Sequence, residues 1–185
     1  MRKRVGEELE VLKAVTGRLD AAGIPYMVTG SIAVNFYAVP RMTRDIDIVV
    51  ELSEQDAPRI VRLFQDDFYV DDEMVRRAIA ERGMFNLIHT GFVIKVDLVV
   101  RKDTEYRRLE FSRRRTVSVE GHPFSMVSPE DLILSKLVWA KESRPEVQLS
   151  DVRNLLASGE KMDREYLSLW AERLSVGGLY GEVAP

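Results

Sequence analysis

The sequence predicts an α/β (α+β) fold, with a small sheet flanked by helices and a C-terminal half made only of helices. Apolar residues recur every three or four positions in several segments, which is the period of an amphipathic helix. Between these segments lie short runs rich in β-branched residues, which are typical of strands. From about residue 128 onwards only the helical pattern remains. The 185 residues suffice for one domain, or for one domain with a small appendage.

Helix and strand signals alternate through the first 81 residues. Gly23 and Pro25 end the first helical pattern, and Pro40 ends the second. Ser53 and Asp56 resemble a capping box at the start of the third helix. The predicted elements are a helix over residues 7–22, a strand over 26–29, a helix over 31–38, a strand over 44–52, a helix over 53–65, a short edge strand over 68–70 and a helix over 71–81.

Two hairpins are predicted next. Apolar runs over residues 85–89 and 92–100 flank Thr90-Gly91, and runs over 115–119 and 123–127 flank Glu120-Gly121. The segment between the hairpins, residues 101–115, is predicted to be a solvated loop and hairpin edge because acidic residues interrupt its basic ones.

The clearest helix start in the chain is Ser128-Pro129-Glu130-Asp131. A serine cap, a proline in the first turn and early acidic residues all favour a helix N-terminus. We expect helices over residues 128–142, 146–157 and 163–174, and a loop-like, frayed tail from Ser175 to the end. The predicted organisation is an α/β core over residues 1–127 and a helical subdomain over 128–185 that packs on it.

Composition excludes several classes of function. The absence of cysteine rules out disulfides and thiolate metal sites, and two histidines are too few for a histidine-rich zinc site. A net charge of −3 gives no global reason to bind nucleic acid. Neither a secretory h-region nor an apolar run long enough to span a membrane is present, so we expect a soluble, cytoplasmic protein with no membrane partner.

Three aspartates in strand-like segments are the candidate catalytic and metal-ligating residues. Asp45 and Asp47 are two residues apart in one predicted strand, so their side chains point to the same face. Like charges this close repel unless a cation lies between them, and oxygen ligands suit magnesium. Asp97 lies in the middle of another apolar run, where an ionised carboxylate also needs a partner. If the two strands are neighbours, the three carboxylates converge.

Gly30-Ser31 is the candidate phosphate-binding turn. It ends one predicted strand and begins a helix, where glycine permits close backbone approach and free helix N–H groups can hold a phosphate. The serine hydroxyl can add a hydrogen bond. These residues and the acid pair together lead to the hypothesis of a magnesium-bound nucleotide.

Each of these features has a simpler interpretation. An isolated Asp-x-Asp is often a solvated strand edge, and a Gly-Ser pair occurs in many turns. Asp97 by itself could be a buried aspartate that forms a salt bridge with Lys95 or an arginine.

Together the motifs resemble the nucleotidyltransferase fold of the DNA polymerase β superfamily. The resemblance rests on a Gly-Ser at the end of a strand, an Asp-x-Asp on the next strand and a later strand aspartate. The segments TRDID (43–47) and SPEDLILSKLVWAKESRPEVQLSDVRNLL (128–156) are more specifically similar to AbiEii-like nucleotidyltransferases, which include toxins of type IV toxin–antitoxin pairs. The resemblance covers residues 26–156 and implies a small mixed sheet.

The resemblance also implies an activity and roles for individual residues. The activity is transfer of a nucleoside monophosphate from an NTP such as ATP, with two Mg²⁺ ions, to RNA such as tRNA, a protein or a small molecule; an antitoxin is a possible partner. Gly30 and Ser31 would hold the triphosphate, Asp45 and Asp47 both metals, and Asp97 the metal near the acceptor while also acting as base. Lys136 and Asp151 match nucleotide-binding positions on C-terminal helices.

Other charged residues leave alternatives open. Arg41 and Arg44 flank the acid pair and could reach a phosphate, or could be ordinary surface charges. Lys136 could be a snorkelling surface lysine, and Asp151 a charge that favours a helix start. RNA binding is a hypothesis for the local basic patch, which consists of Arg101, Arg107, Arg108, Arg113, Arg114 and Arg115.

The sequence therefore supports two hypotheses of different classes, while a third, a polar α/β interaction domain with no ligand, requires all three carboxylates to be incidental. One is a catalytically active, two-metal nucleotidyltransferase. The other is a non-catalytic nucleotide-binding or regulatory module of the same fold, which the compact C-terminal half and the absence of an evident acceptor motif keep open. The sequence selects neither the NTP nor the acceptor.

Overall fold

The computed structural model describes residues 2–43, 45–143 and 146–184, which form two compact units. Unit 1 comprises Met1–Ile32 and Met42–Met126, and unit 2 comprises Ala33–Arg41 and Val127–Pro185. The predicted domain division after residue 127 stays a prediction.

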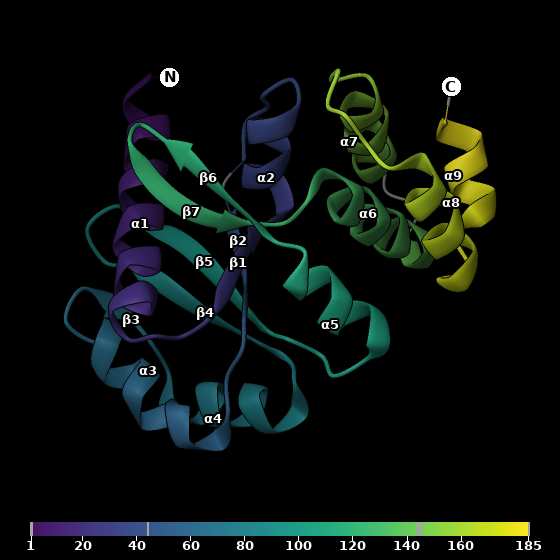
Figure 1. Ribbon diagram of the computed structural model, residues 1–185. Coiled ribbons are helices and arrows are strands. Elements are labelled where there is room, and N and C mark those ends of the chain that lie inside the picture. Colours follow the sequence, from purple (N-terminus) through teal and green to yellow (C-terminus); the bar gives the residue numbers. More distant parts are fainter. Residues whose placement is uncertain (1, 44, 144–145, 185) are drawn as a thin grey trace. The chain divides into compact units, whose positions relative to one another are not determined.

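The order of elements confirms the α/β class (Figure 1). The helices are α1 (Arg2–Ala21), α2 (Gly30–Tyr37), α3 (Ala57–Phe64) after a 3₁₀ turn η1 (Glu54–Asp56), α4 (Asp72–Glu81), α5 (Glu105–Ser112), α6 (Pro129–Ser143), α7 (Glu146–Leu156), α8 (Arg164–Arg173) and α9 (Gly177–Val183). The strands are β1 (Tyr26–Thr29), β2 (Asp45–Val50), β3 (Phe68–Tyr69), β4 (Met84–His89), β5 (Ile94–Val100), β6 (Arg115–Val119) and β7 (His122–Met126).

All of these strands belong to one mixed sheet in unit 1, in the order β3-β4-β5-β2-β1-β7-β6. The β2–β5 and β1–β7 pairs are parallel, and the other neighbours are antiparallel. Both predicted hairpins are present as β4–β5 and β6–β7, and the short strand β3 lies at one edge as predicted. The centre of the sheet is therefore β5-β2-β1. The helix α2 lies between β1 and β2 in the sequence, and β5 is remote from both.

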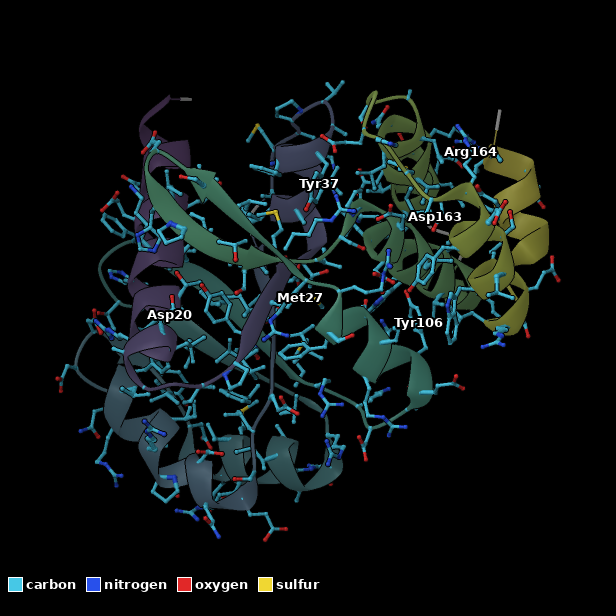
Figure 2. All side chains as sticks on the ribbon, in the orientation of Figure 1. Asp20, Met27, Tyr37, Tyr106, Asp163 and Arg164 are labelled. Carbon is cyan, nitrogen blue, oxygen red and sulfur yellow. The ribbon has the colours of Figure 1, made fainter. Side chains whose placement is uncertain are left out.

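Burial in unit 1 follows the predicted periods. Val11, Leu12, Val15 and Leu19 of α1 are buried, which matches one face of a helix. In β2 the alternating residues Ile46, Ile48 and Val50 are buried, and the intervening positions are more exposed. Met27, a residue of β1 that is labelled in Figure 2, has a fully buried side chain.

Helix starts carry the caps that the sequence predicts. Ser53 and Asp56 form the expected capping box, although the first turn is 3₁₀ and the α-helix begins at Ala57. At α6 the Ser128 hydroxyl accepts a hydrogen bond from the Asp131 N–H (3.1 Å), which holds one of the helix's free amide groups. Asp163, labelled in Figure 2, caps α8 in the same way by accepting from the Tyr166 N–H.

The expectation of a solvated loop over residues 101–115 is wrong for its central part, which is the helix α5. Thr104 caps the helix by accepting from the Arg107 N–H. Tyr106 and Phe111 are buried, so two large aromatic side chains anchor a turn that is otherwise densely charged. Sequence periodicity missed this helix because two anchors five residues apart give too little helical signal.

The expectation of a frayed C-terminal tail is also wrong. The segment Gly177–Val183 forms α9, which contacts α6, α7 and α8 within unit 2. Leu179, Tyr180 and Val183 are buried and lie on one helix face. Three glycines conceal this helix in the sequence, and tertiary packing of the three side chains compensates for their low helix propensity. Among the described helices, none combines the length and apolar character of a membrane span.

Substitutions in α9 test whether the tail is packed. Leu179→Ala should lower the free energy of unfolding by about 2 kcal/mol because it removes buried apolar volume. Gly181→Ala is the matched control: no atom lies within 4 Å of the added Cβ, so the variant should be unchanged or more stable by up to about 1 kcal/mol. Urea denaturation measures both. A frayed tail would leave the stability of the Leu179→Ala protein unchanged.

Candidate active site

The parallel pairing of β2 with β5 brings the three candidate aspartates together in unit 1. Asp47 lies directly beside Asp97 in this register, and Asp45 lies beside Lys95. Residues two apart share a strand face, so these four side chains form a two-by-two group on one face of the sheet. The predicted adjacency of the Asp45/Asp47 and Asp97 strands is confirmed.

The turn between β1 and α2 lies against this group. Thr29, the last residue of β1, pairs with Asp47 across the antiparallel β1–β2 ladder. Gly30 follows with φ of 63°, a left-handed conformation that favours glycine. A Cβ atom at Gly30 would collide with the carboxylate of Asp47. Glycine is therefore required here for two reasons, the backbone angle and the close approach of Asp47, and Ser31 follows it in the first turn of α2.

Lys95 and Asn86 surround the Asp97 carboxylate. The Lys95 Nζ lies 2.9 Å from Oδ2 of Asp97 and 3.7 Å from Oδ1 of Asp45. The Asn86 amide, from the neighbouring strand β4, donates to Oδ1 of Asp97. Hydrogen bonding to Asp97 raises the pKa of Lys95 above its ordinary value, and the nearby carboxylates add to this effect. The simpler interpretation, an Asp97–Lys95 salt bridge, is therefore correct for the arrangement in this structure.

The described residues contain no group of three or more His, Cys, Asp or Glu side chains arranged to hold a metal ion. At this site the Lys95 ammonium contacts the carboxylates of both Asp45 and Asp97. The chemistry of the donor set still fits magnesium: three carboxylates share one face, and glycine leaves room for the Asp47 oxygens.

Lys136 and Asp151 meet in the interior of unit 2. The Lys136 Nζ lies 2.8 Å from Oδ2 of Asp151 and donates to Gln148 (2.9 Å), and Arg41 binds both Asp151 oxygens at 2.8 Å. The side chains of Lys136 and Asp151 are only 7% and 2% exposed, so the surface interpretation of Lys136 is wrong. Burial by itself raises the pKa of Asp151, but the hydrogen bonds and charges of Arg41 and Lys136 outweigh it and hold the pKa below its ordinary value.

Much of the basic patch is neutralised locally. Arg101 pairs with Glu51 (2.5 Å) and Arg107 with Glu110 (2.7 Å), and Arg108 pairs with Asp103 (3.1 Å). The Arg114 guanidinium lies 4.4 Å from the centre of the Phe111 ring. These contacts favour a structural role for the arginines, and RNA binding at the patch stays a prediction.

The predicted residues thus fall into two groups. Unit 1 unites Gly30, Ser31, Asp45, Asp47 and Asp97, and unit 2 unites Lys136 and Asp151 with Arg41. Arg44 lies outside the described residues. Sequence reasoning missed Asn86 altogether and treated Lys95 only as a possible partner. Both are polar residues in otherwise apolar strands, on the strand face that carries Asp97, and this pattern could have identified them.

Comparison with solved structures places the fold among nucleotidyltransferases. A solution structure of the antibiotic-resistance factor ANT(2'')-Ia aligns with a TM-score of 0.61 at 15% identity, over 96% of this chain and 97% of that one. A putative nucleotidyltransferase from Thermotoga maritima aligns at 0.54 and 21% identity, over 77% and 90%. Lincomycin-bound LnuA, a lincosamide antibiotic adenylyltransferase, aligns at 0.52 and 13% identity, over 84% and 96%. At these identities the likeness shows the fold.

The family follows from the sequence itself. The chain belongs to the aminoglycoside-2''-adenylyltransferase family, whose model matches residues 11–132. No curated protein matches the chain. The predicted resemblance to nucleotidyltransferases is thereby confirmed at the level of the class, and the AbiEii-like branch and the toxin–antitoxin role stay predictions.

Two glycines with the same backbone angle test the close approach at the turn. Gly30→Ala should lower the free energy of unfolding by more than the roughly 1–2 kcal/mol of left-handed strain, because its Cβ collides with Asp47. Gly23, at φ of 64° with no atom within 4 Å of a built Cβ, supplies the matched control, and Gly23→Ala should show the strain alone. Equal destabilisation in urea melts would contradict the close approach.

The buried ion pair of unit 2 predicts a pH dependence. The folded pKa of Asp151 is lowered, so its stabilisation is present above the ordinary value of 3.8 and is lost as the pH falls through the folded value. Asp151→Asn should therefore cost about 3 kcal/mol at pH 7, because it leaves Lys136 buried without its counter-ion, and less at pH 3.

Urea melts of both proteins between pH 7 and pH 3 measure this difference. Asp66→Asn, at an exposed position in unit 1, is the control and should change the free energy of unfolding at pH 7 by less than about 0.5 kcal/mol. If the difference in free energy of unfolding between the wild-type and Asp151→Asn proteins stays constant from pH 7 to pH 3, the lowered pKa of Asp151 is contradicted.

Proposed function

We propose that this protein transfers a nucleoside monophosphate from an NTP to a hydroxyl group of an acceptor. The observation that carries the proposal is the register of β2 and β5, which sets Asp47 beside Asp97 with Gly30 against the Asp47 carboxylate. Three carboxylates next to a strand–glycine–helix turn suit a reaction that needs positioning and charge neutralisation more than covalent catalysis. Membership of an adenylyltransferase family supports the same chemistry and favours ATP as the donor.

The turn at Gly30 would hold the phosphates. The turn leads into α2, and the start of an α-helix can bind an anion because its first N–H groups point away from the helix's own hydrogen bonds and its dipole favours negative charge. A larger residue than glycine would bring its side chain into the space that the Asp47 carboxylate occupies. Ser31 would add its hydroxyl to a phosphate oxygen.

Asp45, Asp47 and Asp97 would hold magnesium, which supplies charge neutralisation for the triphosphate and activation of the attacking hydroxyl, with two ions in the fullest form of the chemistry. Asp97 would accept the proton of the acceptor hydroxyl. Asn86 keeps one Asp97 oxygen oriented, which leaves Oδ2, now paired with Lys95, as the oxygen available for that proton.

Two residues of unit 2, Lys136 and Asp151, have less direct support and remain proposed nucleotide-binding residues on the strength of the family resemblance. Arg44 remains a proposed phosphate contact because it flanks the acid pair in the sequence. Lys136 of α6 contacts Asp151 and Gln148 of α7, and Arg41 contacts Asp151 as well. These contacts support a structural role for Lys136 and Asp151, in which they hold α6 against α7.

For the acceptor, a small molecule with hydroxyl groups is the first choice. The family is named for adenylylation of aminoglycosides, and one solved relative is described in complex with adenylyl-2''-tobramycin. RNA such as tRNA and protein are the further acceptors that the sequence suggests, and a toxin role with a cognate antitoxin depends on those acceptors.

A non-catalytic nucleotide-binding module is the second candidate. The specific observation in its favour is that Lys95 and Asn86 occupy both Asp97 oxygens in this structure. Nucleotide binding without release of pyrophosphate over a broad acceptor panel would support this alternative.

Substitution of Asp47 tests the catalytic proposal. The protein is incubated with each labelled NTP and Mg²⁺ in the presence of an aminoglycoside panel, total tRNA or a protein lysate, and transfer of label is measured. Asp47→Asn should reduce transfer by about 10²–10³-fold or more, because it removes one charge that the transition state depends on.

Asp66→Asn makes the same chemical change at an exposed position outside the carboxylate group and should transfer label at the wild-type rate. Unchanged transfer by a folded Asp47→Asn protein would refute the proposed site. The acceptor fraction that takes the label identifies the substrate class.

A further inference from the structure

Lys95 is the one charged residue of the two-by-two group on β2 and β5 that the proposed reaction does not use. It lies opposite Asp45 in the parallel register and two residues before Asp97, so its side chain shares their face. Its ammonium is 2.9 Å from Asp97 and 3.7 Å from Asp45. One lysine therefore contacts carboxylates of both strands.

The charges of the group explain why a cation is needed at this position. Asp45, Asp47 and Asp97 contribute three negative charges and Lys95 one positive charge, so the group carries −2 with the lysine and would carry −3 without it. Carboxylates on neighbouring strand positions repel one another, and a partly buried Asp97 is costly without a partner. Lys95 offsets part of this repulsion because it contacts both Asp45 and Asp97.

Exposure distinguishes the Lys95–Asp97 pair from the ion pair between Lys136 and the buried Asp151. The Lys136 side chain is 7% exposed against Asp151, whereas the Lys95 side chain is 41% exposed against an Asp97 side chain that is 8% exposed. The two ion pairs are similar in length, 2.8 and 2.9 Å. Of these two lysines, Lys95 is the one whose flexible four-carbon stem already reaches solvent, so its ammonium can move from Asp97 into water without leaving a buried charge of its own.

Asn86 allows Lys95 to leave without loss of the Asp97 geometry. The Asn86 amide donates to Oδ1 of Asp97, and Lys95 contacts Oδ2. Departure of the lysine would therefore free one oxygen and keep the other fixed.

We propose that Lys95 is a built-in counter-ion of the carboxylate group, which a divalent cation must displace from between Asp45 and Asp97 in order to bind. This inference rests on the proposed function, because it assigns the same carboxylates to the cation. Lys95 is on this view a positioning residue: it keeps the carboxylates together before the cation arrives and sets the affinity with which the cation binds.

The proposal predicts an increase in cation affinity when the lysine is removed. In the wild-type protein, binding of Mg²⁺ or Mn²⁺ includes the cost of breaking a half-exposed ion pair. Lys95→Met removes the charge and retains an unbranched apolar stem, so the dissociation constant for the metal alone should fall by about two- to fivefold. If Lys95 had only a structural role, its substitution would weaken metal binding or leave the dissociation constant unchanged.

The experiment is isothermal titration of Mn²⁺ and of Mg²⁺ into the full chain without nucleotide. Lys102→Met is the matched control, since it removes the same charge at an exposed position seven residues away, and it should bind metal as the wild-type protein does. Melting temperatures with EDTA and with metal give a second readout. Lys95→Met should melt below the wild-type protein in EDTA and should show the larger rise on addition of metal.

The outcomes separate this inference from the proposed function. If wild-type protein binds metal and transfers label but Lys95→Met binds metal no more tightly, the inference on Lys95 is wrong and the proposed function stands. If the wild-type protein transfers label but binds no metal in the absence of nucleotide, only the inference on Lys95 is wrong; if it neither binds metal nor transfers label, both are wrong. Lys95→Gln, which keeps a hydrogen-bond donor but no charge, replaces Lys95→Met if that variant does not fold, and the same tightening is required of it.

Discussion

The parallel pairing of β2 with β5 is the constraint on which the candidate active site depends. It joins strands that begin about fifty residues apart and sets Asp47 against Asp97 and Asp45 against Lys95. A shift of one residue in this register would turn Asp97 to the opposite face of the sheet and place Val96 or Leu98 beside Asp47. The burial of Ile46, Ile48 and Val50 on the other face of β2 opposes such a shift, so the apolar core maintains the polar group.

The buried aspartates Asp97 and Asp151 are stabilised in two different ways. In unit 2, Asp151 is enclosed by Lys136 and Arg41, and every charge of that network has a partner within the unit. In unit 1, Asp97 has one fixed partner, Asn86, and one exposed partner, Lys95. The first arrangement suits a structural role because removal of any member leaves a buried charge. The second suits a binding site because one partner can exchange for a ligand.

Family membership constrains the chemistry more than the acceptor. The family model matches residues 11–132, which include Gly30, Asp45, Asp47 and Asp97. Lys136, Asp151 and the helices α7 to α9 follow that range. The donor half of the proposed reaction therefore has support from both the family and the geometry.

The sequence by itself determined the class of fold, most element boundaries and the identity of the three aspartates, because strand alternation, capping serines and proline breaks are local signals. It did not determine α5 or α9, because both helices depend on the burial of a few side chains by neighbouring elements. These side chains are Tyr106 and Phe111 in α5, and Leu179 and Tyr180 in α9. Nor did it determine which cation accompanies Asp97. The tertiary structure decided that, because the β4–β5 pairing brings Asn86 to Asp97 and the β2–β5 pairing sets Lys95 beside Asp45. The burial of Lys136 likewise depends on packing of α6 against α7.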